Sequence, residues 1–546
     1  MTQAQLIQKI KETQLFASAG ACQGVSEHAV AGESEFENSS ENGFENAWEF
    51  KETQLSYIFL TKEKAYKIKK SLDIGALGLS ALESRRRFCE QEIALNSGDS
   101  PALCLGLCII YQHPDGTPTF ENTGTPVEYA VAMNRFAEDM VFLRMLERNA
   151  LEEKHLRQLL DTVAKNHQTA TKSPESGLYD QICTDCQADL EALRQASAGL
   201  DPQLSAHLDP HLIEKLHALF EEALQTHKSL IERRAKTHVK LFHRDLSLEG
   251  ICWHEGEAAF FDGMPVHKEP QKADTMADLA TLMVDLFYLD HQQLVFFALN
   301  RYLKKTDDFD GLPLLRLYSA LQALQRCVSH CLTAPELKHQ QAQQREMEKA
   351  KLYGELALVF LQGPKCQRLV VFGGFSGAGK TTLARPTAQR IGAVHIRADA
   401  VRKHLLGVPV SQPAPPEAYQ ASHQAATYDS LLTRADKVLK AGLSVVLDGI
   451  YGAENDRDDV GVFAAAHNLP YTAFWCVVPT AVAHQRMAER LARMGKADQE
   501  VGENHEKNMF TDAGRITWHR LDTVNGKDYV KERVFDLLKL SSPHSN

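Results

Sequence analysis

Long apolar runs and a targeting sequence are both missing from this chain of 546 residues. No stretch is apolar over the length that a membrane span needs, and residues 1–5 lack the basic and then apolar pattern of a signal peptide. We therefore expect a cytoplasmic protein. The 11 cysteines are expected as free thiols in that compartment. The close pairs Cys183/Cys186 and Cys327/Cys331 have no second pair at zinc spacing, which argues against a zinc site.

A strongly basic surface is also missing. The net charge is −11, and the acidic excess falls in the first 360 residues, because basic residues slightly outnumber acidic ones from residue 361 onward. No basic stretch with interleaved aromatic residues occurs, so the composition argues against a nucleic-acid partner and against a nucleic-acid 5′-hydroxyl kinase. The mildly basic second part suits a nucleotide and an anionic substrate. The length of the chain exceeds one hydrophobic core and predicts two or three domains.

The most specific motif in the sequence is a complete phosphate-binding loop. It consists of Gly374, Phe375, Ser376, Gly377, Ala378, Gly379, Lys380 and Thr381, followed by Thr382. A short apolar strand over 369–372 precedes it and a helix is expected over 382–391, so backbone N–H groups would point at phosphate oxygens. We expect Lys380 to reach the β- and γ-phosphates of ATP, and Thr381 to hold Mg²⁺. The alternative is an ordinary glycine-rich turn.

Strands and helices alternate after the loop. Strands are expected over 393–396, 444–447 and 471–478, with helices over 418–441 and 481–494. This alternation predicts an α/β fold in which helices cover both faces of a parallel sheet.

Charged residues follow two of these strands. Asp448 ends one of them and is the candidate second Mg²⁺ ligand. Asp399 follows the other and could accept a proton from an attacking hydroxyl, while Arg402, on the same helical face, could hold an anionic substrate group. The alternative is that Asp399 caps a helix whose basic residues are solvated.

Arginines recur further on in a helical stripe. Arg486, Arg490 and Arg493 stand at positions i, i+4 and i+7, with Lys496 just beyond. Such a stripe, with Arg490 at its centre, could close over a transferring phosphoryl group and neutralise its charge. The alternative is a charged helix that faces solvent.

Together, these motifs resemble the predicted-kinase family of P-loop proteins. That family is similar to gluconate kinases, chloramphenicol phosphotransferases, zeta toxins and the kinase half of phage polynucleotide kinase. The resemblance covers residues 361–525 and lies in the order of the phosphate loop, Asp399, Arg402 and Asp448. It implies phosphoryl transfer from ATP, with Mg²⁺, to a hydroxyl group of an acceptor that the family does not specify.

A second group of chemically suggestive residues precedes the loop. Two paired strands are expected over 56–60 and 65–69, which makes Lys67 a candidate phosphate-binding lysine, and Glu92, in an expected helix, its ion-pair partner. Asp245 follows a strand over 239–242, and Asp262 comes 17 residues later. These two carboxylates could serve as hydroxyl base and Mg²⁺ ligand, respectively.

This first part resembles the aminoglycoside phosphotransferase-like branch of the protein-kinase fold, an α+β architecture. Segments over 66–70, 88–92 and 127–131 resemble a bacterial family that joins such a domain to the P-loop kinase. The sequence departs from the kinase pattern, because Ser247 and Gly250 stand where that pattern has His and a metal-holding Asn. A missing metal ligand should slow a reaction that depends on charge neutralisation, so we expect weak or lost catalysis in this half.

The expected organisation has four parts. A variable, partly disordered segment covers 1–48, and its acidic stretch over 19–47 is rich in Gly, Ser, Glu and Asn. A kinase-like domain over 49–335, a connecting helix over 336–361 and a P-loop domain over 362–546 follow. The sequence favours an ATP-dependent small-molecule kinase with its main site in the second half. The alternative is a nucleotide-binding regulatory ATPase whose degenerate kinase-like half recognises a partner.

Overall fold

The computed structural model describes residues 1–16, 48–53, 55–72, 78–97, 102–199, 201, 204, 208–242, 246–261, 271–364, 366–410, 412–492 and 513–540. The acidic stretch over 19–47 lies outside the described residues. Two compact units make up the chain. The first contains residues 1–162, 169–174 and 238–282, and the second contains residues 163–168, 175–237 and 283–546. Within the described ranges, no helix combines the length and the apolar character needed to cross a bilayer.

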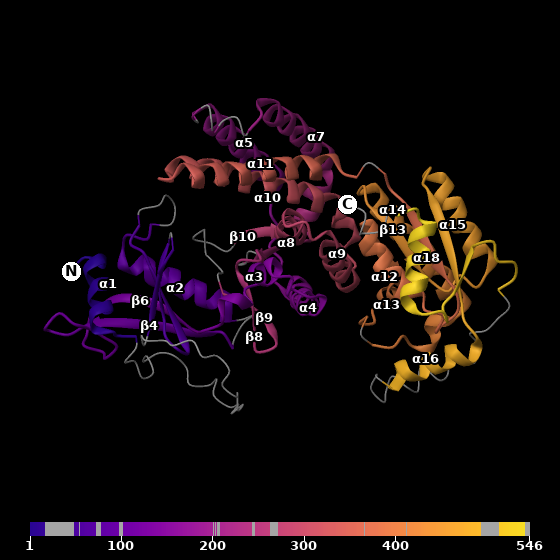
Figure 1. The fold of residues 1–546 in the computed structure, drawn as a ribbon, viewed down its shortest axis with the longest axis horizontal. Coiled ribbons are helices and arrows are strands. Elements are labelled where there is room, and N and C mark those ends of the chain that lie inside the picture. Colours follow the sequence, from indigo (N-terminus) through magenta and orange to yellow (C-terminus); the bar gives the residue numbers. More distant parts are fainter. Residues whose placement is uncertain are drawn as a thin grey trace. The chain divides into compact units, whose positions relative to one another are not determined.

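The first unit is built on an antiparallel sheet of six strands (Figure 1). In spatial order they are β1 (Glu49–Glu52), β2 (Ser56–Leu60), β3 (Lys64–Lys69), β6 (Pro126–Asn134), β4 (Cys104–Gln112) and β5 (Pro118–Thr119). The strand pair predicted around residues 56–69 is confirmed, since β2 and β3 pair antiparallel.

The two faces of this sheet are covered by different helices. Tyr66 and Ile68 share a core with helix α1 (Gln3–Thr13). Ala65 shares a second core with Cys89 of helix α2 (Leu82–Ser97). Because side chains alternate along a strand, residues 65, 67 and 69 of β3 all face α2.

The remaining elements of the first unit are short. They are η2 (Glu138–Met140), α3 (Phe142–Glu147), the first part of α4 (Glu153–Thr169), a β7–β10 pair (Val239–Phe242, Gln271–Asp274), a β8–β9 hairpin (Ile251–His254, Glu257–Phe260) and the start of α8 (Thr275–Tyr288).

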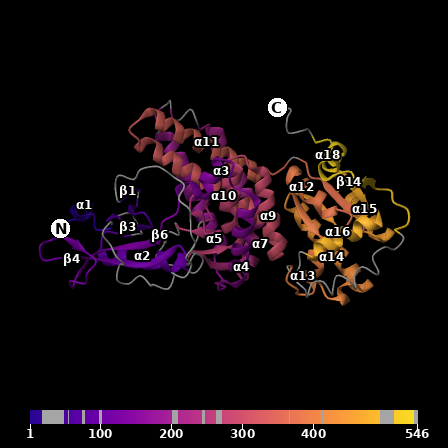
Figure 2. The ribbon, with the colours of Figure 1, turned by 60° about the horizontal axis from the view of Figure 1, so that its bottom comes forward.

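The second unit begins with helices and ends with an α/β sheet (Figures 1 and 2). Its helical elements are α5 (Leu178–Gly199), α7 (Pro210–Ala235), α9 (Gln292–Thr306), η3 (Phe309–Gly311), α10 (Leu312–Thr333), η4 (Ala334–Glu336) and α11 (Gln340–Gln362). The helix expected over 336–361 is thus present over 340–362, and it packs along α10 and α7.

The sheet of the second unit has five parallel strands, as the alternating sequence pattern predicts. Their spatial order is β12 (Ala393–Arg397), β13 (Ser444–Asp448), β11 (Leu369–Gly373), β14 (Tyr471–Val477) and β15 (His519–Asp522). The accompanying helical elements are α12 (Lys380–Ile391), α13 (Ala398–Leu405), η5 (Pro416–Tyr419), α14 (Ala421–Lys440), α15 (Glu454–Ala466), α16 (Thr480–Ala492) and α18 (Lys527–Leu537). Helices cover both faces of the sheet, which confirms the predicted fold class.

The burial of this sheet explains why the sequences of its strands are continuous apolar runs. Val370, Phe372, Val446 and Phe474 are fully or almost fully buried with apolar residues of α12 and α18. A parallel sheet covered on both faces buries every residue of its central strands. The phosphate loop and Asp448 lie at the carboxyl ends of β11 and β13, which are neighbours in the sheet.

Candidate active site

The phosphate-binding loop joins β11 to α12 as its sequence predicts. Gly374 and Gly377 have φ angles of 134° and 78°, which residues with a Cβ rarely adopt. A Cβ on Gly374 would collide with the carbonyl oxygen of Cys476, and one on Gly377 would lie 2.6 Å from that of Ala483. The loop therefore packs so closely on β14 and α16 that only glycine fits at these two positions.

The polar side chains of the loop have partners that hold it in shape. Lys380 Nζ donates to the backbone oxygen of Phe375 at 2.9 Å. From α16, Arg486 donates to the backbone oxygen of Gly377 at 3.3 Å and to that of Thr523 at 2.9 Å. Arg486 therefore braces the loop from outside, a contact that its place in an arginine stripe did not reveal.

Thr381 and Asp448 come together below the loop. Thr381 Oγ1 donates to Asp448 Oδ2 at 2.6 Å, although 67 residues separate them in sequence. A hydroxyl and a carboxylate are hard oxygen ligands, and Mg²⁺ typically takes only one or two such protein groups beside phosphate oxygens and waters. The pair that the sequence predicts as metal ligands therefore has a donor set that fits Mg²⁺.

The Asp448 carboxylate lies in a buried, positively charged setting. His395 Nε2 is 3.4 Å and Arg397 Nε is 3.7 Å from Asp448 Oδ2, and both residues come from the neighbouring strand β12. Burial by itself would raise the pKa of Asp448, but His395, Arg397 and Lys380 outweigh it and lower the pKa to about 2. Burial lowers the pKa of His395, and the neighbouring Asp448 acts in the opposite direction. A pKa of about 2 leaves the Asp448 carboxylate ionised near pH 7.

Asp399 lies in the first turn of α13, beyond the end of β12. Its carboxylate is 3.4 Å from Lys403 Nζ and 3.9 Å from an Arg397 nitrogen, and 36% of its side chain is exposed. The N-cap position of α13 is held by Arg397, so Asp399 is not the capping residue that the alternative interpretation required. Arg397 links the two carboxylates of the site, since it contacts both Asp399 and Asp448.

Arg402, three residues after Asp399 in α13, is buried, and its guanidinium lies 4.7 Å from the ring centre of Tyr419. Its Nε is buried and has no hydrogen-bond partner among the described residues. Nearby, the buried Tyr428 hydroxyl accepts a hydrogen bond from the backbone N–H of Tyr451 at 2.9 Å. Arg402 thus packs on the face of an aromatic ring, and Tyr428 and Tyr451 are in ring contact with each other.

Other predicted site residues are placed elsewhere or lie outside the described residues. Arg490 belongs to α16, whose earlier residue Arg486 contacts the loop. Asp245 and Asp262 lie outside the described residues. In the first unit, Lys67 Nζ lies 3.1 Å from Glu92 Oε1, so the predicted ion pair is present.

The Lys67–Glu92 pair has a third member that the sequence interpretation missed. Lys69 Nζ is 2.5 Å from Glu92 Oε2, and the side chains of Lys69 and Glu92 are completely buried. The signal was available, because Lys69 stands two residues after Lys67 and so on the same face of β3. Glu92 therefore fixes two lysines at once, and burial lowers the pKa of Lys69.

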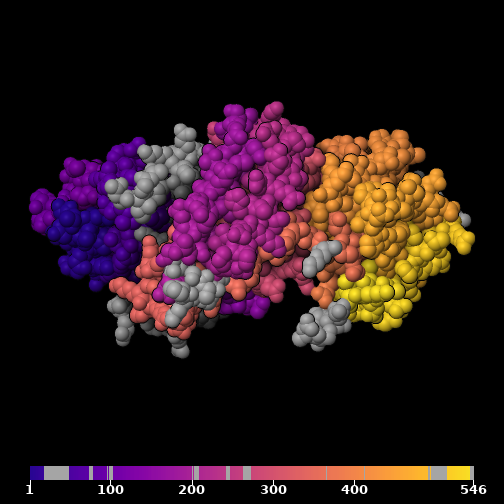
Figure 3. Space-filling view, turned by 90° about the horizontal axis from the view of Figure 1, so that it is seen from above, coloured from indigo at the N-terminus to yellow at the C-terminus, as the bar shows by residue number. Residues whose placement is uncertain are grey.

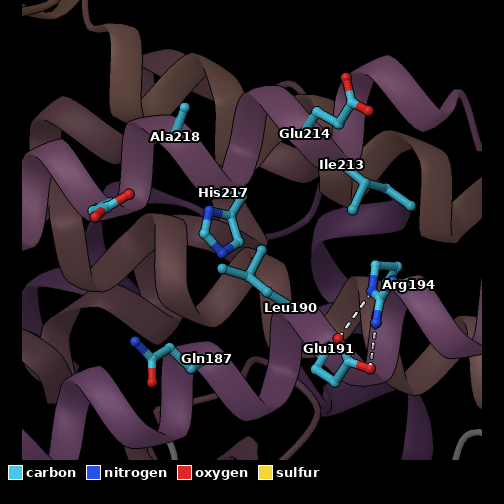
Figure 4. Close-up of a pocket in the computed structure, with 9 residues that line it drawn as sticks. Gln187, Leu190, Glu191, Arg194, Ile213, Glu214, His217 and Ala218 are labelled. Atoms are coloured by element: carbon cyan, nitrogen blue, oxygen red, sulfur yellow. Dashed lines mark hydrogen bonds and ion pairs between the residues drawn. The ribbon is translucent and has the colours of Figure 1, made fainter.

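A hollow in the helical part of the second unit is a second candidate for a binding site. It lies between α5 and α7, whose residues face the viewer near the middle of Figure 3, and measures about 410 Å³. Leu190, Ile213 and Ala218 give it an apolar floor, and Figure 4 shows Arg194 turned to Glu191. Two hydrogen bonds of 2.9 Å join that pair. The loop site, with its charged groups around a phosphate cradle, is the better candidate for chemistry.

A comparison with protein families finds a match that includes the phosphate loop and Asp448. Residues 369–511 match the family model of an AAA domain. Uncharacterised proteins of Mycobacterium tuberculosis and Mycobacterium bovis are 26% identical over 488 residues, which is 88% of this chain and 93% of theirs.

Two solved structures are also similar to parts of the chain. A sugar kinase from Janibacter is 22% identical with a TM-score of 0.23, over 32% of this chain and 96% of its own. A choline/ethanolamine kinase family protein from Mesorhizobium loti is 11% identical with a TM-score of 0.35, over 59% of this chain and 94% of its own. None of these proteins assigns an acceptor to this chain.

Proposed function

We propose that this protein transfers the γ-phosphoryl group of ATP to a hydroxyl group of a small molecule, at the site in its second unit. The observation that carries the proposal is the 2.6 Å contact between Thr381 and Asp448 beneath a complete phosphate loop, with the half-exposed Asp399 at the end of the adjacent strand. The first two residues would hold Mg²⁺, which neutralises phosphate charge when bound. A nucleotide switch has no acceptor hydroxyl to deprotonate, so it would not need a carboxylate at the position of Asp399.

The proposed reaction uses each group in turn. Lys380 would bring its charge to the β- and γ-phosphates, and Arg490, from α16, would approach the transferring group. The acceptor oxygen would attack phosphorus as its proton passes to Asp399, and the bond between phosphorus and the bridging oxygen of ADP would break. Arg402 and Tyr419 would orient the acceptor beside Asp399.

The first unit is proposed to bind nucleotide weakly or to contribute little phosphotransfer. The ion pairs of Glu92 with Lys67 and Lys69 would preserve a phosphate-binding lysine. Gly250, in contrast, offers no side chain to a metal, and its N–H donates to the backbone oxygen of Ser247 at 3.0 Å. Asp245 and Asp262 complete the proposed set as base and metal ligand.

We also propose that the chain belongs with two-domain proteins that join a kinase-like half to a P-loop kinase half. The mycobacterial relatives support this pairing, because their similarity extends over 88% of this chain and therefore over both halves. We keep the predicted boundaries as part of this proposal, with the kinase-like part ending near 335 and the P-loop part beginning near 362. The end of α11 at Gln362 supports the second boundary.

The experiment compares ATP affinity with acceptor phosphorylation in the full-length protein. A screen of small hydroxyl compounds, followed by release of ADP, identifies an acceptor. Asp399→Asn keeps the shape of the side chain but removes its charge, so transfer should fall by roughly 10²–10⁴-fold while ATP affinity stays unchanged. The matched control is Asp458→Asn, which removes an exposed carboxylate from α15. Undiminished transfer in Asp399→Asn, or ATP hydrolysis without any acceptor, would favour the regulatory ATPase instead.

A further inference from the structure

Helix α9 docks against the edge of the sheet of the second unit. β12 is an end strand of that sheet and has β13 on only one side. On its other side, the side-chain amide of Asn300 donates to the Ala393 oxygen at 3.0 Å, and its oxygen accepts from the His395 N–H at 2.6 Å. α9 also contacts α12, beside which it lies in Figures 1 and 2.

The Asn300 side chain takes the place of a residue in a neighbouring parallel strand. Such a residue bonds to the oxygen of one strand residue and to the N–H of the residue two positions further on. Asn300 does the same on either side of Val394, because a side-chain amide offers the donor and the acceptor of a peptide group. Val394 itself pairs with Val445 of β13. β12 is therefore held from both sides, and Asn300 fixes its position on the outer one.

The part of β12 that Asn300 holds leads directly into the candidate active site. His395, whose N–H is held, places Nε2 3.4 Å from the Asp448 carboxylate. Arg397 stands opposite Asp448 in the register of β12 and β13, and its side chain contacts both Asp448 and Asp399. A shift of β12 along β13 would therefore move both side chains away from Asp448, and with them the start of α13.

Two further contacts of α9 hold the same side of the site. The backbone oxygen of Lys304 lies 3.1 Å from Nε2 of His404 in α13, the helix that carries Asp399. Asp307, at the C-cap of α9, accepts two hydrogen bonds from the guanidinium of Arg434 in α14, one of them at 2.8 Å. A single helix that precedes the P-loop part thus holds β12, α13 and α14.

We propose that Asn300 is a positioning residue for the phosphoryl transfer, because it fixes the edge strand that sets Arg397 between Asp399 and Asp448. This inference rests on the proposed function and deepens it. Asn300 bonds to the backbone of β12, so its effect reaches the reaction through that strand. A displacement of about 1 Å is enough to slow a reaction by about 10²-fold, so the hold on β12 matters for the rate. The helices before residue 362 would thereby take part in the reaction of the P-loop part.

The test compares variants of the full-length protein in two measurements. Asn300→Leu has a side chain of similar size that can neither donate nor accept a hydrogen bond. Tyr302→Phe is the matched control, because it removes from the same helix a hydroxyl that lies 2.8 Å from His167 Nδ1 and leaves the Asn300 contacts intact. The measurements are steady-state phosphorylation of the acceptor found in the screen, and hydrogen–deuterium exchange of the peptides that contain β12 and β11.

Asn300→Leu should lower kcat at least about tenfold and leave the KM for ATP within about twofold, because the phosphate loop keeps its place. The β12 peptide should exchange at least about fivefold faster, with the β11 peptide unchanged. Tyr302→Phe should keep kcat and β12 exchange within about twofold of the wild type, although it loses a buried hydrogen bond. A purely structural role for Asn300 would affect the two variants alike.

Three results would overturn the inference. They are an unchanged kcat in Asn300→Leu, an unchanged exchange of β12, and a loss of ATP affinity that matches the loss of kcat. Asn300→Ala, with a smaller side chain, replaces Asn300→Leu if circular dichroism shows that variant to be misfolded. Failure of the wild type to phosphorylate any acceptor would instead contradict the proposed function, whereas exchange of β12 would still report on Asn300, and so the two failures are distinguishable.

Discussion

Replacement of Asp448 by Asn tests the proposed metal site most directly. The lowering of the Asp448 pKa from its ordinary 3.8 to about 2 corresponds to about 2 kcal/mol, since one pKa unit is worth about 1.4 kcal/mol. Because the folded pKa is lowered, this stabilisation is fully present above pH 3.8 and is lost as the pH falls through about 2. Asp448→Asn should therefore lower the free energy of unfolding at pH 7 by about 2 kcal/mol, as measured by urea denaturation.

The same substitution should separate metal-dependent from metal-free nucleotide binding. Asn cannot supply the charge that holds Mg²⁺ next to Thr381, so ATP affinity with Mg²⁺ should fall. Affinity in excess EDTA should stay the same or rise, because a negative charge near the phosphates is removed. We expect kcat to fall by about 10²–10³-fold. The control is Asp522→Asn, which changes an exposed carboxylate at the end of β15 in the same sheet. If Asp448→Asn kept the Mg²⁺ dependence of the wild type, Asp448 would not be a metal ligand.

Four further outcomes are expected. Lys380→Ala should abolish most ATP turnover with an unchanged circular dichroism spectrum, and turnover within about twofold of wild type would place the main site elsewhere. Gly377→Ala should reduce ATP affinity and cost roughly 1–3 kcal/mol in urea unfolding, because its φ is 78° and the added Cβ would lie 2.6 Å from the Ala483 oxygen; an unchanged midpoint would show that the loop yields. Asp245→Asn should leave ATP hydrolysis within about twofold, whereas loss of most activity would reverse the ranking of the two sites. The lowered pKa of Lys304 should make stability rise between pH 8 and 10.5, because the unfolded chain then binds more protons; Lys304→Met should flatten this rise in thermal unfolding.

The sequence by itself determined the local parts of the site. Apolar runs and glycines at set positions predicted a strand over 369–372, a phosphate loop and a helix over 382–391, because these depend on residues close together in the chain. The structure has the strand over 369–373 and the helix over 380–391. The pairing of Lys67 with Glu92 was also predicted, and the alternation of β3 could have added Lys69.

Only the tertiary structure decided which distant residues meet. The order of strands in the sheet brings Asp448 to Thr381 and sets His395 and Arg397 beside it, and no local pattern encodes that order. Packing of α9 against β12 brings the backbone oxygen of Lys304 to His404 of α13, although 100 positions separate them. Strand order and helix docking depend on how apolar faces that are far apart in sequence are buried together. Local sequence patterns therefore do not predict which distant charged residues come into contact.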